Sequence, residues 1–387
     1  MALTEAVIPA MSLGPSPLRS NPKMPRFNAP SAQLPAGSLQ AELLRMTLPG
    51  STSGSPRLRK SSQKGFKTCS EMPLSHRGIS PIETKVIGRQ NVLEKRGKQV
   101  EFRRSGDLEE ALTSLAELGD KAQVLAGGTD VMIQLERGEI FPETLVHIER
   151  VEGMRDIAEN GRLTLGALAT HIDLAQSPVL CDRYKSVAHA ASLIGGWQTQ
   201  AVGTIGGNVC NASPAADLLP PLLVHGTNVL LVSKDRGERE VPLADFVVGR
   251  RTIAREPDEL VAGFSLDLSD GRTADVYKKV GRRGAMEVAI VGLAIRLSVD
   301  QAGTINDARI AVCSVAPVPF RAQAAEQALL GTKASGKETG SAAALLLEQV
   351  EPIDDVRATA NYRKMVLPRI FESAVADCYL QAAKDLS

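Results

Sequence analysis

The stretch "GTIGGNVCNASPAADLLPPLLV", Gly203 to Val224, places glycines, two asparagines and one aspartate directly before an apolar segment. Glycine permits a positive φ angle and lets a ligand approach the backbone closely. Successive N–H groups that point into one concavity bind anions, and a helix that starts there adds to the attraction. The stretch therefore indicates either a phosphate-binding loop or, as the simpler alternative, a tight turn that requires glycine. Pro220 and Pro221 are expected to turn the chain into a core helix or strand.

A second loop of the same kind, "AGGTD", runs from Ala126 to Asp130. Neither loop fits G-x-G-x-x-G or G-x-x-x-x-G-K-[ST], so neither a Rossmann dinucleotide site nor a P-loop is indicated. Two such loops in one chain could hold a pyrophosphate from both sides, with Thr129, Thr204 and Asn208 adding hydrogen bonds. Asp217, which follows the second loop, could accept hydrogen bonds from ribose hydroxyls.

Periodic patterns around the loops predict a mixed α/β chain. A capping box at Asp107 opens a helix that ends near Gly119, and Gly138 ends the next helix, Val131 to Arg137. Further strands are expected at 123–126, 144–148, 162–168, 228–233, 259–268, 274–280, 288–299 and 307–316, and helices at 183–195, 320–331, 341–350 and 361–384. This order predicts an α/β unit over 99–155, a second mixed region over 156–274, and an α+β domain of antiparallel strands and helices over 275–387.

The first part of the chain differs in composition from the rest. Residues 1–70 carry nine Lys or Arg, nine prolines and only two acids, Glu5 and Glu42. Such a segment cannot bury enough apolar surface to offset its ordering entropy. We therefore expect 1–98 to be a disordered or tether extension, and the chain to be cytoplasmic. The alternative is an organelle transit peptide, which is also basic, serine-rich and poor in acids.

The composition and the residue spacings exclude several classes of function. A formal net charge of +1 provides no field that would attract nucleic acid, and no apolar run is long enough for a transmembrane helix. The five cysteines show no C-x-x-C spacing and the histidines show no ligand spacing, so we expect no metal site on this chain. No nucleophile–base–acid set emerges, and we assign no catalytic residue. Cys210 is interpreted as a small buried filler rather than a redox thiol.

Three motifs in order carry a resemblance to a known family: "VLAGGTDVMIQLERGEIFPETLVHI", "QAVGTIGGNVCNASPAADLLPPLL" and "NYRKMVLPRI". Together they resemble the FAD-binding medium subunit of the molybdenum hydroxylases, the family of xanthine dehydrogenases and carbon monoxide dehydrogenases. The resemblance covers 99–384 and leaves 1–98 outside. It implies an α+β fold: a two-lobed FAD-binding domain of the vanillyl-alcohol-oxidase (PCMH) type, with lobes at 99–155 and 156–274, followed by a C-terminal α+β domain.

The resemblance also implies which residues hold the FAD. The family's two loops map onto 124–131 and 204–208, its downstream aspartate and lysine onto Asp217 and Lys278, and its adenine-sandwiching pair onto Ile194 and Val261. The implied set is Val124, Leu125, Ala126, Gly127, Gly128, Thr129, Asp130, Val131, Ile194, Thr204, Ile205, Gly206, Gly207, Asn208, Asp217, Val261 and Lys278. In the xanthine-oxidising members the first residue of the pair is aromatic, so Ile194 retains apolar burial but loses stacking.

The function implied is that of an electron-transfer flavoprotein subunit. Partners are then a small subunit with 2Fe–2S clusters and a large molybdenum subunit, with electrons leaving FAD to NAD or another acceptor. Two alternatives stay open. One is a free-standing flavin oxidase, which would need its own acid–base residues. The other is a non-catalytic scaffold subunit that has lost flavin, in which the glycine loops would only add flexibility.

Overall fold

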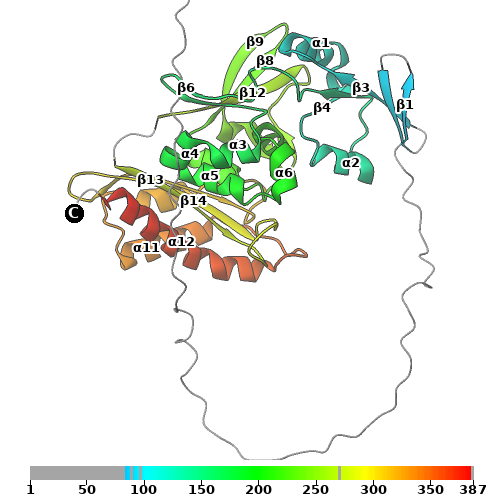
Figure 1. The fold of residues 1–387 in the computed structure, drawn as a ribbon. Coiled ribbons are helices and arrows are strands. Elements are labelled where there is room, and N and C mark those ends of the chain that lie inside the picture. Colours follow the sequence, from blue (N-terminus) through cyan, green and yellow to red (C-terminus); the bar gives the residue numbers. More distant parts are fainter. Residues whose placement is uncertain (1–82, 88–89, 96–97, 269–271, 385–387) are drawn as a thin grey trace, which may run out of the picture. The chain divides into compact units, whose positions relative to one another are not determined.

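The computed structural model describes residues 83–87, 90–95, 98–268 and 272–384. The described chain has the α+β architecture predicted from the sequence, with two lobes followed by a C-terminal domain (Figure 1). Each lobe has its own five-stranded sheet, the C-terminal domain has a four-stranded sheet, and residues 247–249 and 252–253 of the second lobe form a small two-stranded sheet.

The first lobe contains a five-stranded sheet in the order β1-β2-β3-β5-β4. Strands β3, β5 and β4 are parallel, whereas β2 pairs with β3, and β1 with β2, in antiparallel fashion. Helix α1 begins at Asp107, whose side chain accepts a hydrogen bond from the Glu110 N–H, and helix α2 ends at Gly138 with φ +69°. The elements are β1 Glu83–Ile87, β2 Gln90–Lys95, β3 Lys98–Arg104, α1 Leu108–Leu118, β4 Ala122–Leu125, α2 Val131–Arg137 and β5 Thr144–His147.

Strands β1 and β2 lie inside the segment that the composition assigned to the extension. Residues 1–70, whose composition predicts the extension, lie outside the described residues together with the other positions before Glu83. In 83–95 the sequence is richer in β-branched residues, such as Thr84, Val86 and Val92, which favour strands. The described part of the extension is therefore a hairpin on the edge of the first sheet.

The second lobe contains a five-stranded antiparallel sheet in the order β6-β7-β12-β8-β9, with short helices between its strands. The second glycine loop leads into a helix of this lobe, whereas the first leads into α2 of the first lobe. The elements are β6 Ile157–Glu159, β7 Leu163–Gly166, α3 His171–Gln176, α4 Pro178–Arg183, α5 Lys185–Ser192, α6 Trp197–Val202, α7 Ile205–Cys210, α8 Leu219–Val224, β8 Asn228–Ser233, β9 Gly237–Pro242, α9 Leu243–Phe246, β10 Val247–Gly249, β11 Thr252–Ile253 and β12 Glu259–Leu266.

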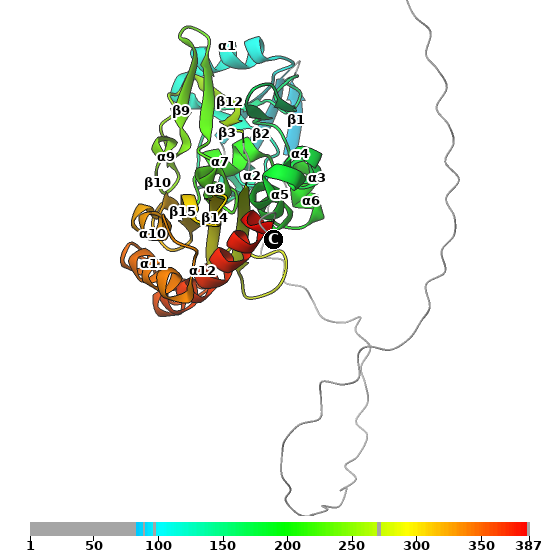
Figure 2. The ribbon, with the colours of Figure 1, turned by 90° about the vertical axis from the view of Figure 1, so that its left-hand side faces the viewer.

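The C-terminal domain is an antiparallel sheet in the order β13-β14-β15-β16. Helices α10 to α12 cover one face, and α5 and α8 of the second lobe lie against the other (Figures 1 and 2). Helix α11 begins earlier than the pattern indicated, because Ser335 and Glu338 form a capping box. The elements are β13 Thr273–Val280, β14 Val291–Val299, β15 Ile305–Cys313, β16 Phe320–Arg321, α10 Gln323–Leu329, α11 Gly336–Glu348 and α12 Ala360–Ala382.

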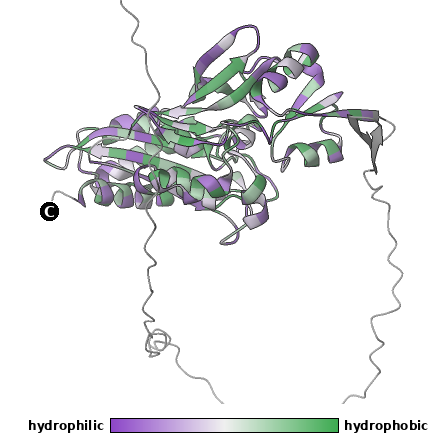
Figure 3. Ribbon diagram, turned by 45° about the horizontal axis from the view of Figure 1, so that its top comes forward, coloured by the Kyte–Doolittle hydropathy of each residue, from purple (hydrophilic) through white to green (hydrophobic). Residues whose placement is uncertain are grey.

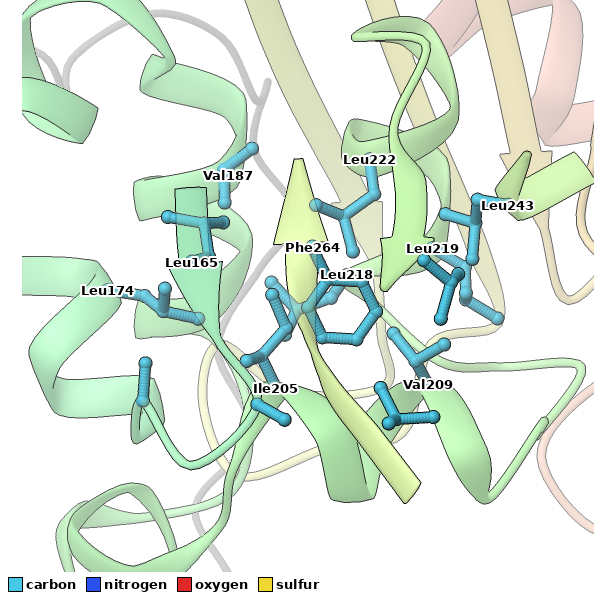
Figure 4. Close-up of a cluster of buried hydrophobic side chains, with 14 of the residues drawn as sticks. Leu165, Leu174, Val187, Ile205, Val209, Leu218, Leu219, Leu222, Leu243 and Phe264 are labelled. Atoms are coloured by element: carbon cyan, nitrogen blue, oxygen red, sulfur yellow. The ribbon is translucent and has the colours of Figure 1, made fainter. Parts of the chain in front are cut away.

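The largest hydrophobic core lies around β12 and the helices of the second lobe. Figure 4 shows Phe264 of β12 in its middle, with Ile205 of α7 and Leu222 of α8 nearby, and all three side chains are fully buried. Hydrophobic colour concentrates on the interior strands and hydrophilic colour on the outer turns (Figure 3). Each helix in this core therefore has a fixed position, and α7 carries the second glycine loop with it.

Candidate functional site

The first glycine loop joins the end of β4 to the start of α2. Gly128 has a φ of +73°, which L-residues rarely adopt. A Cβ atom on Gly127 would lie 1.7 Å from the backbone oxygen of Val202, so the loop and the end of α6 touch through their backbones. In the described part of the chain, the N–H groups of Gly128 and Thr129 donate to no protein acceptor. They are the donors that the loop can offer to an anion.

The second glycine loop is the first turn of α7. Thr204 caps this helix, because its hydroxyl accepts from the Gly207 N–H at 3.0 Å. The Gly206 N–H donates to the Ala167 oxygen at 2.9 Å, and a Cβ on Gly206 would lie 2.7 Å from that oxygen. The N–H groups of Gly206 and Gly207, which were expected to be free for a ligand, therefore already donate to acceptors within the protein. What the loop offers instead is Asn208 Oδ1, which is buried and accepts no hydrogen bond among the described residues.

The two loops face one cavity of about 610 Å³, within the usual range for ligand pockets of about 300–1,000 Å³. Most of the residues implied by the resemblance line it: Val124, Ala126, Gly127, Gly128, Thr129, Asp130, Val131, Ile194, Thr204, Gly206, Gly207, Asn208 and Val261. Residues separated by more than a hundred positions in sequence thus meet at one site. Its walls combine glycine backbone, amides and aliphatic side chains.

Four residues of the implied set lie away from the cavity. Leu125 packs in the small core of the first lobe, and Ile205 is fully buried in the main core. Asp217 is buried and bonded to two residues of β13, and Lys278 points outward to Asp377. Their side chains are directed by packing and pairing toward other parts of the protein, so their assignment to the site is not supported by the geometry.

The lysine that reaches the interior is Lys279, the neighbour of the one implied. Its Nζ donates to Asp217 Oδ2 at 2.8 Å and to the Leu193 oxygen at 3.1 Å, and the Tyr277 hydroxyl donates to Asp217 Oδ1 at 2.6 Å. Burial raises the pKa of Asp217, while Lys279 and Tyr277 oppose the rise. The period of two along a strand could have predicted this, because Tyr277 and Lys279 share one face of β13 and Lys278 lies on the other.

His171 and Cys210 also line the cavity, although neither was among the implied set. His171 is almost fully buried, its Nδ1 has no partner among the described residues, and burial lowers its pKa to about 4. Cys210 is half-buried and its pKa is raised to about 11, mainly by burial. Both groups are therefore neutral near pH 7, and the thiol is not activated as a nucleophile.

Polar residues from both lobes also line the cavity, namely Gln134, Glu139, Asn211, Arg251 and Arg255. Their sequence context is ordinary for loops and helix ends, so no local pattern marked them. The described residues contain no cluster of His, Cys, Asp or Glu suited to a metal ion. Within the same residues, no helix is long and apolar enough to span a membrane.

Comparison with known proteins matches two family models in order along the chain. Residues 98–266 match the FAD binding domain in molybdopterin dehydrogenase, and residues 275–378 match the CO dehydrogenase flavoprotein C-terminal domain. The glyceraldehyde dehydrogenase medium chain of Sulfolobus acidocaldarius is 32% identical over 267 residues, which are 68% of this chain and 92% of that one. The xanthine dehydrogenase FAD-binding subunit of Escherichia coli O157:H7 is 28% identical over 288 residues, 74% of this chain and 98% of that one.

A solved structure agrees with the sequence comparisons. Carbon monoxide dehydrogenase from Hydrogenophaga pseudoflava contains a chain that superposes with a TM-score of 0.70 at 29% identity, covering 73% of this chain and 98% of that one. Fold, motif order and chain coverage therefore agree. The chain belongs to the family of FAD-binding medium subunits of the molybdopterin dehydrogenases and is a flavoprotein subunit of an oxidoreductase.

Proposed function

We propose that this chain holds FAD between its two glycine loops and serves as the electron-transfer subunit of a molybdenum hydroxylase complex. In that complex, electrons pass from iron–sulfur clusters through FAD to NAD or another acceptor. The observation that carries the proposal is the cavity itself, where the N–H groups of Gly128 and Thr129 and the buried Asn208 Oδ1 lack protein partners. Buried polar groups normally find hydrogen bonds, so the unpaired Asn208 oxygen suggests a polar ligand. The two N–H groups belong to partly exposed residues and are free to bind such a ligand.

The residues of the cavity suit the parts of a dinucleotide. The Gly128 and Thr129 N–H groups would bind phosphate oxygens, and Asn208 Oδ1 would accept from a hydroxyl or an N–H group. Ile194 and Val261 provide apolar walls for an aromatic ring. Bound FAD would supply the redox chemistry, while the protein supplies binding and positioning.

The cavity favours a relay over a free-standing oxidase. His171 and Cys210 are neutral near pH 7, because their pKa values are about 4 and about 11. The Glu139 and Arg251 side chains are engaged with each other, and Asp130 with Asn211. Among the described residues of the cavity, no acid–base pair is left to activate an organic substrate. The scaffold alternative is disfavoured because a protein without a ligand would leave buried polar groups unsatisfied.

The partner subunits follow from the family. The relative from Sulfolobus is named as a medium chain, which implies chains of other sizes in its complex. We propose a small subunit with 2Fe–2S clusters and a large subunit with molybdenum as the partners here.

The substitution Gly207→Val tests cofactor binding separately from folding. Gly207 lines the cavity, and a Cβ there would approach only the Thr204 hydroxyl, at 3.1 Å. The Thr204 hydroxyl would have to shift by a few tenths of an ångström, and the rest of the valine side chain would occupy cavity space. We expect the purified full chain to show a flavin spectrum and the variant to lose it at an unchanged melting temperature of the apoprotein. Gly336→Val, where a Cβ meets no atom within 4 Å, is the control. Normal flavin occupancy in the Gly207 variant would refute this placement of FAD.

The relay assignment is tested by anaerobic mixing of the flavin-loaded chain with purines, N-heterocycles and carbon monoxide. Dithionite should bleach the flavin band, whereas these substrates should bleach it only when the partner subunits are present. Bleaching by a substrate without partners would favour the free-standing oxidase. NADH added to the isolated chain tests the acceptor, because reduction of the flavin by NADH is the reverse of electron delivery to NAD. If NADH has no effect, another acceptor is indicated.

A further inference from the structure

Five polar side chains connect the two lobes along one side of the cavity. Asn211 Nδ2 donates to Asp130 Oδ1 at 3.0 Å, and Gln134 Nε2 donates to Asn211 Oδ1 at 2.9 Å. Beside them, the Arg251 guanidinium donates to Glu139 Oε2 at 2.6 Å. We call this set, Asp130, Gln134, Glu139, Asn211 and Arg251, the cross-lobe bridge. All of its members line the cavity, and each of its bonds joins the first lobe to the second.

The backbone on the second-lobe side of the bridge is strained. Ala212 and Arg251 have φ angles of +44° and +57°, although neither is glycine. The Arg251 N–H donates to the Ala212 oxygen at 3.0 Å, so the two unusual residues hold each other. Strained backbone persists where the surroundings fix it, and it is found most often at binding sites and switches. Here it directs the side chains of Asn211 and Arg251 toward the first lobe.

The first-lobe side of the bridge is centred on α2. Asp130 directly precedes this helix and makes no capping hydrogen bond, Gln134 lies on the helix and Glu139 follows its end. The helix contains no buried residue, and its apolar side chains pack only partly against the small core of the first lobe. The bridge is therefore the set of hydrogen bonds that ties α2 to the second lobe across the cavity.

The bridge cannot serve as a ready set of ligand donors, because its groups already bind one another. Asn211 uses its amide nitrogen on Asp130 and its amide oxygen on Gln134. The Arg251 and Glu139 side chains remain partly exposed to solvent. Bonds at such positions are individually weak and exchange readily with water. A set of weak bonds along one side of a cavity can open transiently without disturbing either core.

We propose that the cross-lobe bridge is a clasp that holds α2 against the second lobe beside the cavity and thereby sets the rates at which FAD enters and leaves. The proposal rests on the proposed function, because it needs FAD in this cavity. The bridge residues act as positioning residues and take no part in electron transfer.

The experiment compares FAD exchange in the full chain and in three variants. Asn211→Asp removes the donor to Asp130 and adds a facing negative charge, so we expect FAD to dissociate about tenfold faster or more. Glu139→Gln and Arg251→Asn each remove the ion pair, and we expect an increase of about two- to fivefold. Asparagine is chosen at Arg251 because it tolerates a positive φ. Glu240→Gln is the control, since it removes a solvent-exposed ion pair with Arg162 outside the cavity.

A clasp predicts that the variants bind FAD faster as well as release it faster, as seen by stopped-flow flavin fluorescence. The rate at which dithionite bleaches the bound flavin should not change. A purely structural role would instead lower the melting temperature of the apoprotein and leave both exchange rates at the values of the control. Exchange rates equal to those of Glu240→Gln, in a chain that does hold FAD, would overturn the clasp. A parent chain that holds no FAD would refute the proposed function instead.

Discussion

Replacing Lys279 by methionine should destabilise the protein far more than the same change at its neighbour Lys278. The Lys279 and Asp217 side chains are each only 8% exposed, and they are joined at 2.8 Å. Removing one partner of such a buried pair costs about 3–5 kcal/mol, because the other charge stays buried. Lys278 and Asp377 are 36% and 46% exposed, and pairs of this kind contribute about 0.2–1 kcal/mol.

The assay is urea unfolding of the apoprotein. The unfolding free energies of the variants are compared on condition that the slope of free energy against urea concentration is the same for each. The double variant Asp217→Asn/Lys279→Met removes both charges, so it should recover a large part of the loss caused by Lys279→Met alone. Tyr277→Phe, which removes the hydroxyl donor to Asp217, should cost about 1.5–3 kcal/mol. Equal losses at Lys278 and Lys279, or strictly additive losses in the double variant, would refute the reasoning.

Three other predictions concern single positions. Gly127→Ala would place a Cβ 1.7 Å from the Val202 oxygen and should abolish flavin occupancy, measured by the visible spectrum, whereas Gly284→Ala meets no atom within 4 Å and should retain it. His171 has a pKa of about 4 in the folded chain against 6.5 as a free group. As the pH falls, the His171 side chain of the unfolded chain therefore binds a proton before that of the folded chain. Between pH 6.5 and about pH 4 this should lower the unfolding free energy, by about 3 kcal/mol at most. When urea unfolding is measured at about pH 7 and about pH 4.5, the drop in unfolding free energy between the two should be smaller in His171→Gln than in the parent chain. Gly340→Ala, inside α11 with open space at its Cβ, should raise the unfolding free energy by about 0.5–1 kcal/mol.

Features with local causes could be predicted from the sequence. The bounds of α2 agree with the prediction because Gly138 supplies the left-handed cap that ends the helix. The capping pattern at Asp107 likewise located α1. The two glycine loops were recognised by composition, and the structure brings both to one cavity.

Features that depend on distant partners could not be predicted in the same way. The Gly206 N–H is taken by the Ala167 oxygen, and nothing near Gly206 in the sequence marks that acceptor. The choice between Lys278 and Lys279 depends on the register of β13, which follows from Tyr277 pointing inward. Arg251 reaches the cavity through a strained turn, and strain of this kind at a non-glycine residue leaves no sequence pattern.

The position of α8 between two sheets determines whether this protein can be divided into fragments that fold separately. Every residue of α8 is buried, partly by its own lobe and partly by β14 and β15. The two domain models that match the chain divide it before β13, yet a fragment that ends there would expose this helix to water. The boundary between the two matches therefore does not separate two independently folding units. A chain nicked between β12 and β13 should keep its halves together, whereas the N-terminal half expressed alone should aggregate.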